Sequence, residues 1–172
     1  MRTMKSKYLK SILLYVISVA PALADSTILD MHSITADGIG DSIGTITIKR
    51  VSEGLKFDPR LKGLTPGVHG FHVHENGACG SGEKDGLIQA GLAAGSHYDP
   101  DKSGQHLGPY GMGHRGDLSM LDVSNDGTAL MPITSNRLTL DELHGRSIII
   151  HANSDDYQKQ PGGPRIACGI VP

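Results

Sequence analysis

Short stretches of alternating apolar and polar residues recur along this chain, which is the pattern of strands with one buried face. Between residues 45 and 48, for example, threonines alternate with isoleucines. Turn-forming residues separate such stretches, at 36–40, 58–60, 66–67 and 125–127. The pattern predicts eight strands, over residues 27–33, 43–49, 55–57, 70–75, 118–123, 128–132, 147–152 and 166–171.

The same pattern leaves little room for helices. Only residues 139–144 are typical of a helical turn, with Thr139 as the N-cap and Glu142 three residues later. Two long glycine-rich stretches, 76–116 and 153–164, lack strand patterning and are predicted to be functional loops. Eight short strands with so little helix predict an all-β fold, a sandwich or a barrel.

The N-terminal segment has a different character. Residues 1–10 carry four basic and no acidic side chains, residues 11–20 are mostly apolar, and Ala22-Leu23-Ala24 offers small residues to a signal peptidase. We expect residues 1–24 to be a cleaved signal peptide and residues 25–172 to form one domain, because 148 residues suit a single core. A retained membrane anchor is the alternative, but the apolar run is short for a bilayer span.

Cleavage changes the charge balance. It would leave 12 basic against 18 acidic residues, a formal net charge of −6 with histidine neutral. Such a surface argues against nucleic acid and anionic membranes as partners. Export also permits disulfides, so Cys79 and Cys168 can form one bridge, with two free thiols as the alternative.

The segment Gly70-Phe-His-Val-His-Glu75 carries the first chemical signal. In a strand, Phe71 and Val73 would face the core while His72 and His74 project together from the other face. Imidazole suits copper and zinc. The pair therefore indicates a metal site, with solvated or hydrogen-bonded histidines as the alternative.

Further histidines follow in the predicted loops or at strand edges, where function tends to concentrate. With the first pair they make six histidines and one aspartate, more than one four-coordinate site needs, so two neighbouring metal ions fit better. The added candidates are His97, His106, His114, Asp117 and His151. We expect structural or solvent-exposed roles for the remaining histidines, His32, His69 and His144.

Four motifs, in this order, give the chain a resemblance to the bacterial, exported copper,zinc superoxide dismutases, from about residue 43 to residue 171. They are Gly-Phe-His-Val-His at 70–74, Gly-x-His-Tyr-Asp-Pro at 95–100, His-x-Gly-Pro-x-Gly-x-Gly-His-x-Gly-Asp-Leu at 106–118 and Gly-Gly-Pro-Arg-x-Ala-Cys-Gly at 162–169. The resemblance implies an eight-stranded Greek-key, immunoglobulin-like sandwich or barrel with two functional loops. It also implies a periplasmic enzyme, monomer or homodimer, that dismutes superoxide to dioxygen and hydrogen peroxide.

The resemblance assigns one copper and one zinc to each chain. His97 would bridge the two ions and carry a proton during turnover. Four imidazoles suit Cu(II), and three imidazoles with a carboxylate close a zinc site. The copper ligands would be His72, His74, His97 and His151, and the zinc ligands His97, His106, His114 and Asp117.

Two further residues take their roles from the resemblance. Arg165 would attract and orient superoxide near copper, because a guanidinium stays charged and presents a fork of donors. Asp155 would link His72 to His106, with the neighbouring Asp156 as the alternative.

Departures from the family pattern bear on the rate. Ser96 stands beside His97, where the family more often has glycine. The loop between His151 and Arg165 is short, which leaves less chain to shape the channel and its charge, with Lys159 as a second cation there. The alternative function is an exported copper- or zinc-binding protein with weak or lost turnover. A zinc hydrolase would need an open zinc position, which the closed ligand set does not offer.

Overall fold

The computed structural model of the chain describes residues 25–157 and 162–172. The predicted signal peptide, residues 1–24, and Lys159 lie outside the described residues. In chain order the elements are β1 (Ser26–Thr35), β2 (Gly38–Val51), β3 (Gly54–Leu61), β4 (Gly67–His69), β5 (Phe71–His74), β6 (Gly82–Lys84), β7 (Leu87–Gln89), the 3-10 helix η1 (Leu92–Ala94), β8 (Leu121–Val123), β9 (Ile133–Ser135), α1 (Leu140–Leu143), β10 (Ser147–His151) and β11 (Arg165–Ile170).

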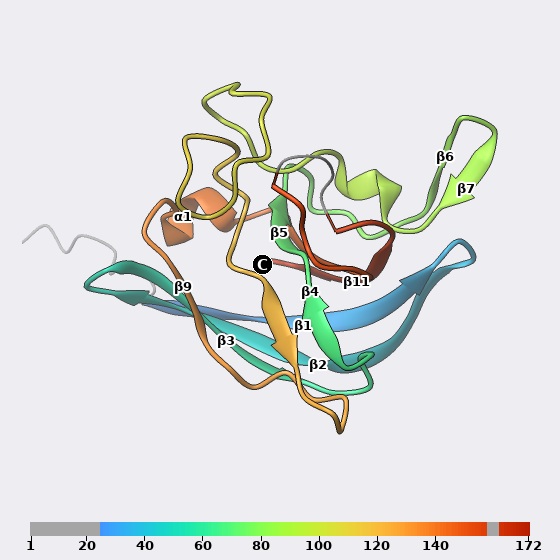
Figure 1. Cartoon of the computed structure of the whole chain (residues 1–172), viewed down its shortest axis with the longest axis horizontal. Helices are drawn as coiled ribbons and strands as arrows, with labels where there is room; N and C mark the ends of the chain where they lie inside the picture. Colours follow the sequence, from blue (N-terminus) through green and yellow to red (C-terminus); the bar gives the residue numbers. More distant parts are fainter. Residues whose placement is uncertain (1–24, 158–161) are drawn as a thin grey trace, which may run out of the picture.

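The predicted all-β fold is confirmed. One curled antiparallel sheet has the order β5-β10-β11-β1-β2-β3-β9, and β4 pairs with β8. With β4 and β5 taken as one strand interrupted at Gly70, and the β6–β7 hairpin set apart, eight strands remain among the described residues. Figure 1 shows the β1–β2–β3 layer on one side of the molecule and the long loops gathered on the other.

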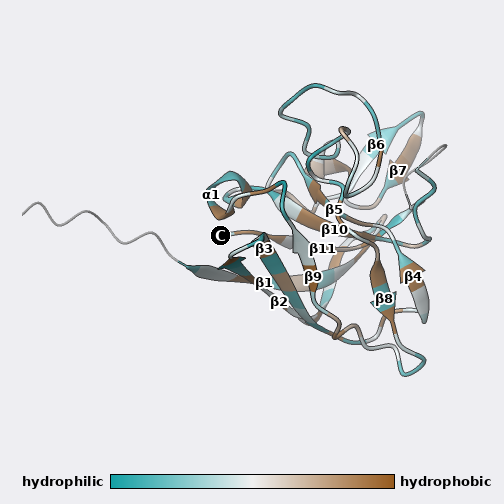
Figure 2. Cartoon of the chain, turned by 60° about the vertical axis from the view of Figure 1, so that its left-hand side comes forward, coloured by the Kyte–Doolittle hydropathy of each residue, from teal (hydrophilic) through white to brown (hydrophobic). Residues whose placement is uncertain are grey.

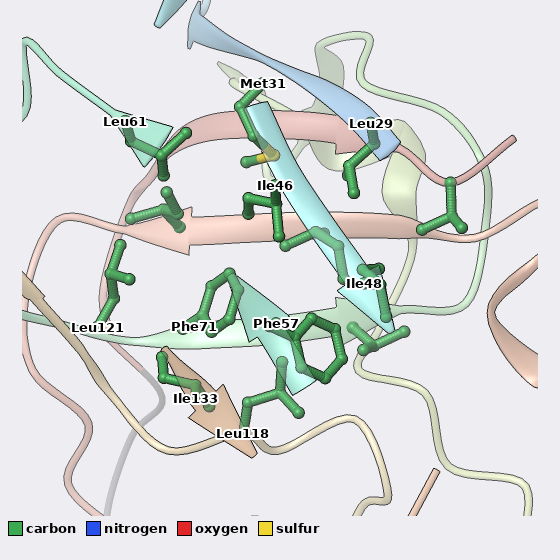
Figure 3. Close-up of a cluster of buried hydrophobic side chains, with 14 of the residues drawn as sticks. Leu29, Met31, Ile46, Ile48, Phe57, Leu61, Phe71, Leu118, Leu121 and Ile133 are labelled. Carbon is green, nitrogen blue, oxygen red and sulfur yellow. The ribbon is translucent and has the colours of Figure 1, made fainter. Parts of the chain in front are cut away.

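Apolar side chains from the inward-facing positions form one main core, drawn in Figure 3. Phe57 and Phe71, the only two phenylalanines of the chain, meet there edge to face with ring centroids 6.0 Å apart. Val73 is fully buried in the same cluster. The prediction that Phe71 and Val73 face the core is thus confirmed, and the alternation of a strand turns His72 and His74 to the other face. In Figure 2 the long loops at the top are mostly hydrophilic, whereas hydrophobic and hydrophilic segments alternate along several strands.

Two predictions, which concern the regions of β3 and β9, were wrong. Of the strand expected at 128–132, only an isolated bridge between Ala129 and Leu61 forms, and the strand β9 lies at Ile133–Ser135. The turn expected at 58–60 lies inside β3, where Pro59 stands opposite Ile46 of β2. Residues 129 and 133 pair with Leu61 and Phe57 in one register, and Pro59, which has no N–H to donate, lies between these two pairs, where the pairing is interrupted.

The first long loop carries more structure than its composition predicts. Residues 76–116 include the β6–β7 hairpin, whose turn residues Asp85 and Gly86 both have positive φ angles, 55° and 76°. An Asp-Gly turn of this kind is a known hairpin signal. The short helix was predicted correctly: α1 follows Thr139, whose N–H donates to Glu142 at 2.8 Å. Among the described residues, no helix is long and apolar enough to cross a membrane.

Candidate metal centre

Strands β5 and β10 form the floor of the candidate site. They pair antiparallel, with His72 opposite Ile149 and His74 opposite Ser147. On the other edge of β5, isolated backbone bridges place Asp117 beside His72 and His97 beside His74. Residues from the first loop thereby extend the strand pairing, and histidines that are distant in sequence meet.

This loop approaches β5 closely because of one glycine. The N–H of Val73 donates to the carbonyl of Gly116 at 2.9 Å. A Cβ atom at Gly116 would lie only 2.3 Å from the carbonyl oxygen of Val73. Any side chain at that position would push the loop off the strand, and Asp117 with it.

Four histidines form the first cluster, in agreement with the copper set implied by the resemblance. One ligand atom from each lies within 4.8 Å of those of the others. All four side chains are buried, and the rings of His72 and His97 have centroids 4.0 Å apart. The cluster comprises His72, His74, His97 and His151.

Three of these imidazoles have one ring nitrogen fixed by a hydrogen-bond acceptor. The other nitrogen of each is buried and has no hydrogen-bond partner among the described residues. Orphaned buried nitrogens are costly unless a metal ion or another partner meets them. The fixed pairs are His72 Nε2 with Asp155 Oδ2 at 2.9 Å, His74 Nδ1 with the carbonyl of Gly95 at 3.0 Å, and His151 Nδ1 with the carbonyl of Gly163 at 2.8 Å.

The protonation states of the cluster suit a metal cation. Burial lowers the pKa of His72 and of His74 well below the ordinary value, and the neighbouring His97 adds to the effect. Burial likewise lowers the pKa of His151 to about 4. At neutral pH these rings are therefore neutral, which is the form of histidine that ligates metals.

A second cluster surrounds Asp117, whose side chain is fully buried. Its Oδ1 lies 2.8 Å from His97 Nδ1 and 3.4 Å from His114 Nδ1, and its Oδ2 lies 2.9 Å from His106 Nδ1. Burial alone would raise the pKa of Asp117, but the close imidazoles of His106 and His97 hold it below the usual range. An anionic carboxylate ringed by three imidazoles is the donor set expected for a closed zinc site.

His72 also lies close to this second cluster. Its ligand atom is within 4.8 Å of those of His97, His106 and Asp117. However, His72 already donates Nε2–H to Asp155, so only one of its nitrogens is free, and that nitrogen can serve a single ion. His114 is therefore the better fourth member of the Asp117 cluster.

Asp155 lies between the two clusters. Its Oδ2 accepts from His72, and its Oδ1 lies 3.8 Å from His106 Nε2, beyond hydrogen-bonding distance. The same Oδ1 accepts the N–H of Gly162 at 2.8 Å. Because a Cβ atom at Gly70 would stand 2.6 Å from Asp155 Oδ1, the glycine that interrupts β4 and β5 makes room for this carboxylate.

Arg165 opens β11 beside the histidine cluster. Its guanidinium donates to the carbonyls of Gly91 at 2.5 Å and Gly95 at 2.6 Å. The carbonyl of Gly95 also accepts from His74, so one peptide group joins the arginine to the cluster. The charge of Arg165 is also among the causes that lower the pKa of His74 and His151, which places a cation near the four histidines.

Other sequence predictions can be placed as well. Cys79 and Cys168 form a disulfide, so the predicted bridge is confirmed. His69 is buried, and both of its ring nitrogens lie against backbone carbonyls, of His151 at 2.7 Å and Thr65 at 2.8 Å. Neither nitrogen is free for a metal, in line with the predicted structural role.

Three basic residues around the site were not singled out from the sequence. Lys84 lines a cleft of about 490 Å³ together with Arg165. Arg137 donates to the carbonyl of His114, and Arg115, which follows His114 in the loop, donates to Glu142 of α1. Arg115 stands inside a metal-binding motif, but its ion pairs join segments far apart in sequence, so spacing alone could not reveal them.

Comparison with known proteins places these clusters in context. The family model for copper/zinc superoxide dismutase (SODC) matches residues 42–171. Superoxide dismutase [Cu-Zn] 2 of Salmonella typhimurium is 46% identical over 171 residues, which cover 96% of this chain and 99% of the relative. The structure of the Cu/Zn superoxide dismutase from Brucella abortus superimposes with a TM-score of 0.83 at 43% identity, over 86% of this chain and 99% of that one. The solution structure of the monomeric copper, zinc superoxide dismutase from Salmonella enterica gives 0.77 at 48% identity, with the same coverage.

Proposed function

The chain belongs to the copper/zinc superoxide dismutase family and dismutes superoxide, and from that premise we propose how its residues divide the work. Two superoxide anions and two protons give one dioxygen and one hydrogen peroxide. When bound, copper supplies the one-electron chemistry by alternating between Cu(II) and Cu(I). The chain supplies ligands, a proton, an attractive charge and a closed surrounding.

The copper site is proposed to consist of His72, His74, His97 and His151. The observation that carries this assignment is the orientation of the imidazole rings by hydrogen bonds within the protein. Three of the four rings donate one N–H to a protein acceptor and leave the other nitrogen buried and unpaired. Such hydrogen bonds fix the tautomer and the ring orientation of a ligand histidine.

The zinc site is proposed to consist of His97, His106, His114 and Asp117. Support comes from the distances of 2.8–3.4 Å between the imidazole nitrogens and the carboxylate, and from the anionic state of Asp117. His97 belongs to both sites. Its Nδ1 lies toward Asp117, and we assign to its other nitrogen the uptake and delivery of the proton that the peroxide product needs.

Arg165 is proposed to attract and orient the substrate. It is held by two carbonyls and lies beside the histidine cluster, so its charge is fixed in position rather than free to swing. Asp155 is proposed to orient His72. Its Oδ1, 3.8 Å from His106 Nε2, is proposed to favour the tautomer of His106 that carries the proton on Nε2. Burial raises the pKa of Asp155, which marks it as a carboxylate whose charge needs these partners.

The cellular setting is a proposal as well. We infer export to the periplasm with removal of residues 1–24; the basic and apolar character of that segment and the Cys79–Cys168 disulfide support an oxidising compartment. The Salmonella enterica relative is monomeric, and one chain contributes every residue of the proposed site. We therefore propose an active monomer, with a homodimer as the alternative.

Metal content and turnover, measured on the same sample of the processed chain, test the proposal. One copper and one zinc per chain, with fast dismutation, are expected. The copper EPR spectrum should change when zinc is removed, because His97 is shared. A copper spectrum indifferent to zinc would contradict the bridge, and full metal content without turnover would favour the metal-binding alternative.

A further inference from the structure

His114, a proposed zinc ligand, lies on a part of the first loop that the sheet does not hold directly. Its side chain is 19% exposed, whereas the side chain of Asp117 is fully buried. Its own N–H donates to the carbonyl of Gln105 at 2.9 Å, which ties the two arms of the loop to each other. Two arginine side chains tie this part of the loop to residues outside it.

Arg137 contacts the peptide groups on either side of this ligand. Nη1 donates to the carbonyl of His114 at 3.0 Å and Nη2 to the carbonyl of Gly113 at 2.6 Å. The carbonyl of His114 also accepts the N–H of Asp117 at 3.3 Å. One half-buried guanidinium therefore fixes two consecutive carbonyls and shares an acceptor with the next proposed ligand.

Arg115 anchors the same short segment in another direction. It forms a bidentate pair with Asp101 at 2.7 and 2.8 Å, and it donates to Glu142 at 2.9 Å. Glu142 belongs to α1 and accepts the N–H of Thr139. Both arginines thus tie residues 113–115 to residues 137–142, a segment outside the loop.

We propose that Arg137, assisted by Arg115, is a positioning residue for zinc. The two side chains hold His114 near Asp117 before the metal arrives, so that the loop need not be ordered by the metal itself. This inference rests on the zinc set proposed above, and it adds residues that do not touch the ion.

The expected loss of zinc affinity can be judged from the cost of ordering a loop when the metal binds. Ordering a flexible segment on binding costs affinity, and pre-organisation removes that cost. Residues that orient metal ligands typically change metal affinity by about 10–100-fold when they are replaced. The fork of Arg137 is suited to this role because lysine, with a single ammonium group, cannot hold two carbonyls in one plane.

The test compares Arg137→Met with Arg60→Met in the disulfide-bonded processed chain. Arg60 lies on β3, is 66% exposed, and faces Asp58 at 3.7 Å, so its replacement removes the same charge far from the loop. Zinc affinity is measured by competition with a chelator, and Co²⁺ in the zinc position reports the ligand geometry through its visible absorption. Copper affinity is measured on the zinc-free proteins.

We expect Arg137→Met to weaken zinc binding by about 10–100-fold and to alter the cobalt spectrum. Arg60→Met should change neither, and copper affinity should be the same in all three proteins. Arg137→Lys should restore only part of the zinc affinity. Arg115→Met should act in the same direction as Arg137→Met.

Unchanged zinc affinity in Arg137→Met overturns the inference. So does an equal loss of copper and zinc affinity, or a fall in melting temperature that is the same with and without zinc, since these indicate general stabilisation. If His114→Ala leaves the zinc affinity intact, the proposed zinc set itself fails. Should Arg137→Met not fold, Arg137→Lys and Arg115→Met decide by the same criteria.

Discussion

The two halves of the metal centre are built from different kinds of structure. Three of the proposed copper ligands, His72, His74 and His151, lie on β5 and β10, strands of the main sheet, and are at most 3% exposed. The proposed zinc ligands His106 and His114 lie on a loop and have side chains that are 11% and 19% exposed.

This difference teaches where the rigidity of each half comes from. Backbone ladders fix the copper half, so its geometry is set by the same hydrogen bonds that make the sheet. Side-chain contacts fix the zinc half, and metal binding can add to them. The copper affinity should therefore fall chiefly when a ligand is removed. The zinc affinity should also fall when a side chain that supports the loop is removed. His97 belongs to both and couples them.

Removing one ligand from each half gives the largest expected effects. His151→Ala deletes a ligand at the end of β10 and should release copper while zinc stays, with activity falling by several orders of magnitude. His114→Ala should release zinc, retain copper and keep part of the activity. Elemental analysis with turnover on each variant checks this.

His97→Ala is the control for coupling between the halves, because it should disturb both metals. If His114→Ala lost as much copper as His151→Ala does, the division into two halves would be wrong.

The copper half, which lies mainly on strands, was the easier one to predict from the sequence. The alternation Phe71-His-Val-His74 fixes which side chains face the core, because a strand has a period of two. The hydrophobic pattern likewise predicted β1, β10 and β11 to within two residues, although β2 begins five residues earlier than predicted. It misplaced β9 and put a turn at Pro59, because the apolar pattern alone does not distinguish a proline inside a strand from a turn.

The zinc half, which lies mainly on a loop, could not be predicted from the local sequence pattern alone. No periodicity links His106 to Asp117, and the resemblance to a family supplied that set. The supports formed by Arg115 and Arg137 escaped prediction because their acceptors are backbone carbonyls and carboxylates distant in sequence. Such contacts depend on the loop conformation, which composition does not encode.

The disulfide joins the two regions, and breaking it should have the next largest effect. Cys79 lies in the first loop and Cys168 in β11, at a sequence separation of 89. In the chain-entropy model a loop of that length stabilises the fold by about 4–5 kcal/mol. Urea unfolding of the metal-free protein should show a loss of that size on reduction.

The Cys79→Ser/Cys168→Ser double variant is the control, since reductant should leave its unfolding curve unchanged. Recovery of two alkylatable thiols from the native exported protein would contradict the role of the bridge.

The buried histidines of the copper half should also make the stability of the metal-free protein sensitive to acid. The pKa of His151 is about 4 in the folded chain, against about 6.5 when unfolded. Between these values the unfolded chain binds a proton that the folded chain does not, so the free energy of unfolding falls as the pH drops from 6.5 to 4. His151 alone should account for about 3 kcal/mol, and the lowered pKa values of His72 and His74 act in the same direction.

Urea unfolding at several pH values measures this slope. His151→Gln should flatten it without removing it, whereas His32→Gln, at a half-buried position away from the clusters, should leave it unchanged. A metal-free protein equally stable at pH 4 and 6.5 would contradict the buried, neutral state of these rings.

The smallest expected effect concerns the approach of the substrate. After removal of residues 1–24 the chain would carry a net charge of −6, which repels an anion. Screening limits that repulsion to about 8 Å at physiological ionic strength, so the charges nearest copper decide the encounter. Arg165→Gln should lower the rate by about tenfold and weaken its dependence on salt.

Three variants separate the charge of Arg165 from its hydrogen bonds. Arg165→Lys keeps the cation but loses the paired contacts to Gly91 and Gly95, so a rate close to wild type would assign the effect to charge alone. Arg165→Glu should reverse the salt dependence, because the nearest charge would then repel superoxide, and Lys159→Glu should do less. Pulse radiolysis across ionic strengths distinguishes the cases. In the wild type the rate should fall as salt is added; a rate that rises instead would mean that the acidic surface outweighs Arg165 even at short range, and that the strand-built half binds copper without steering the substrate toward it.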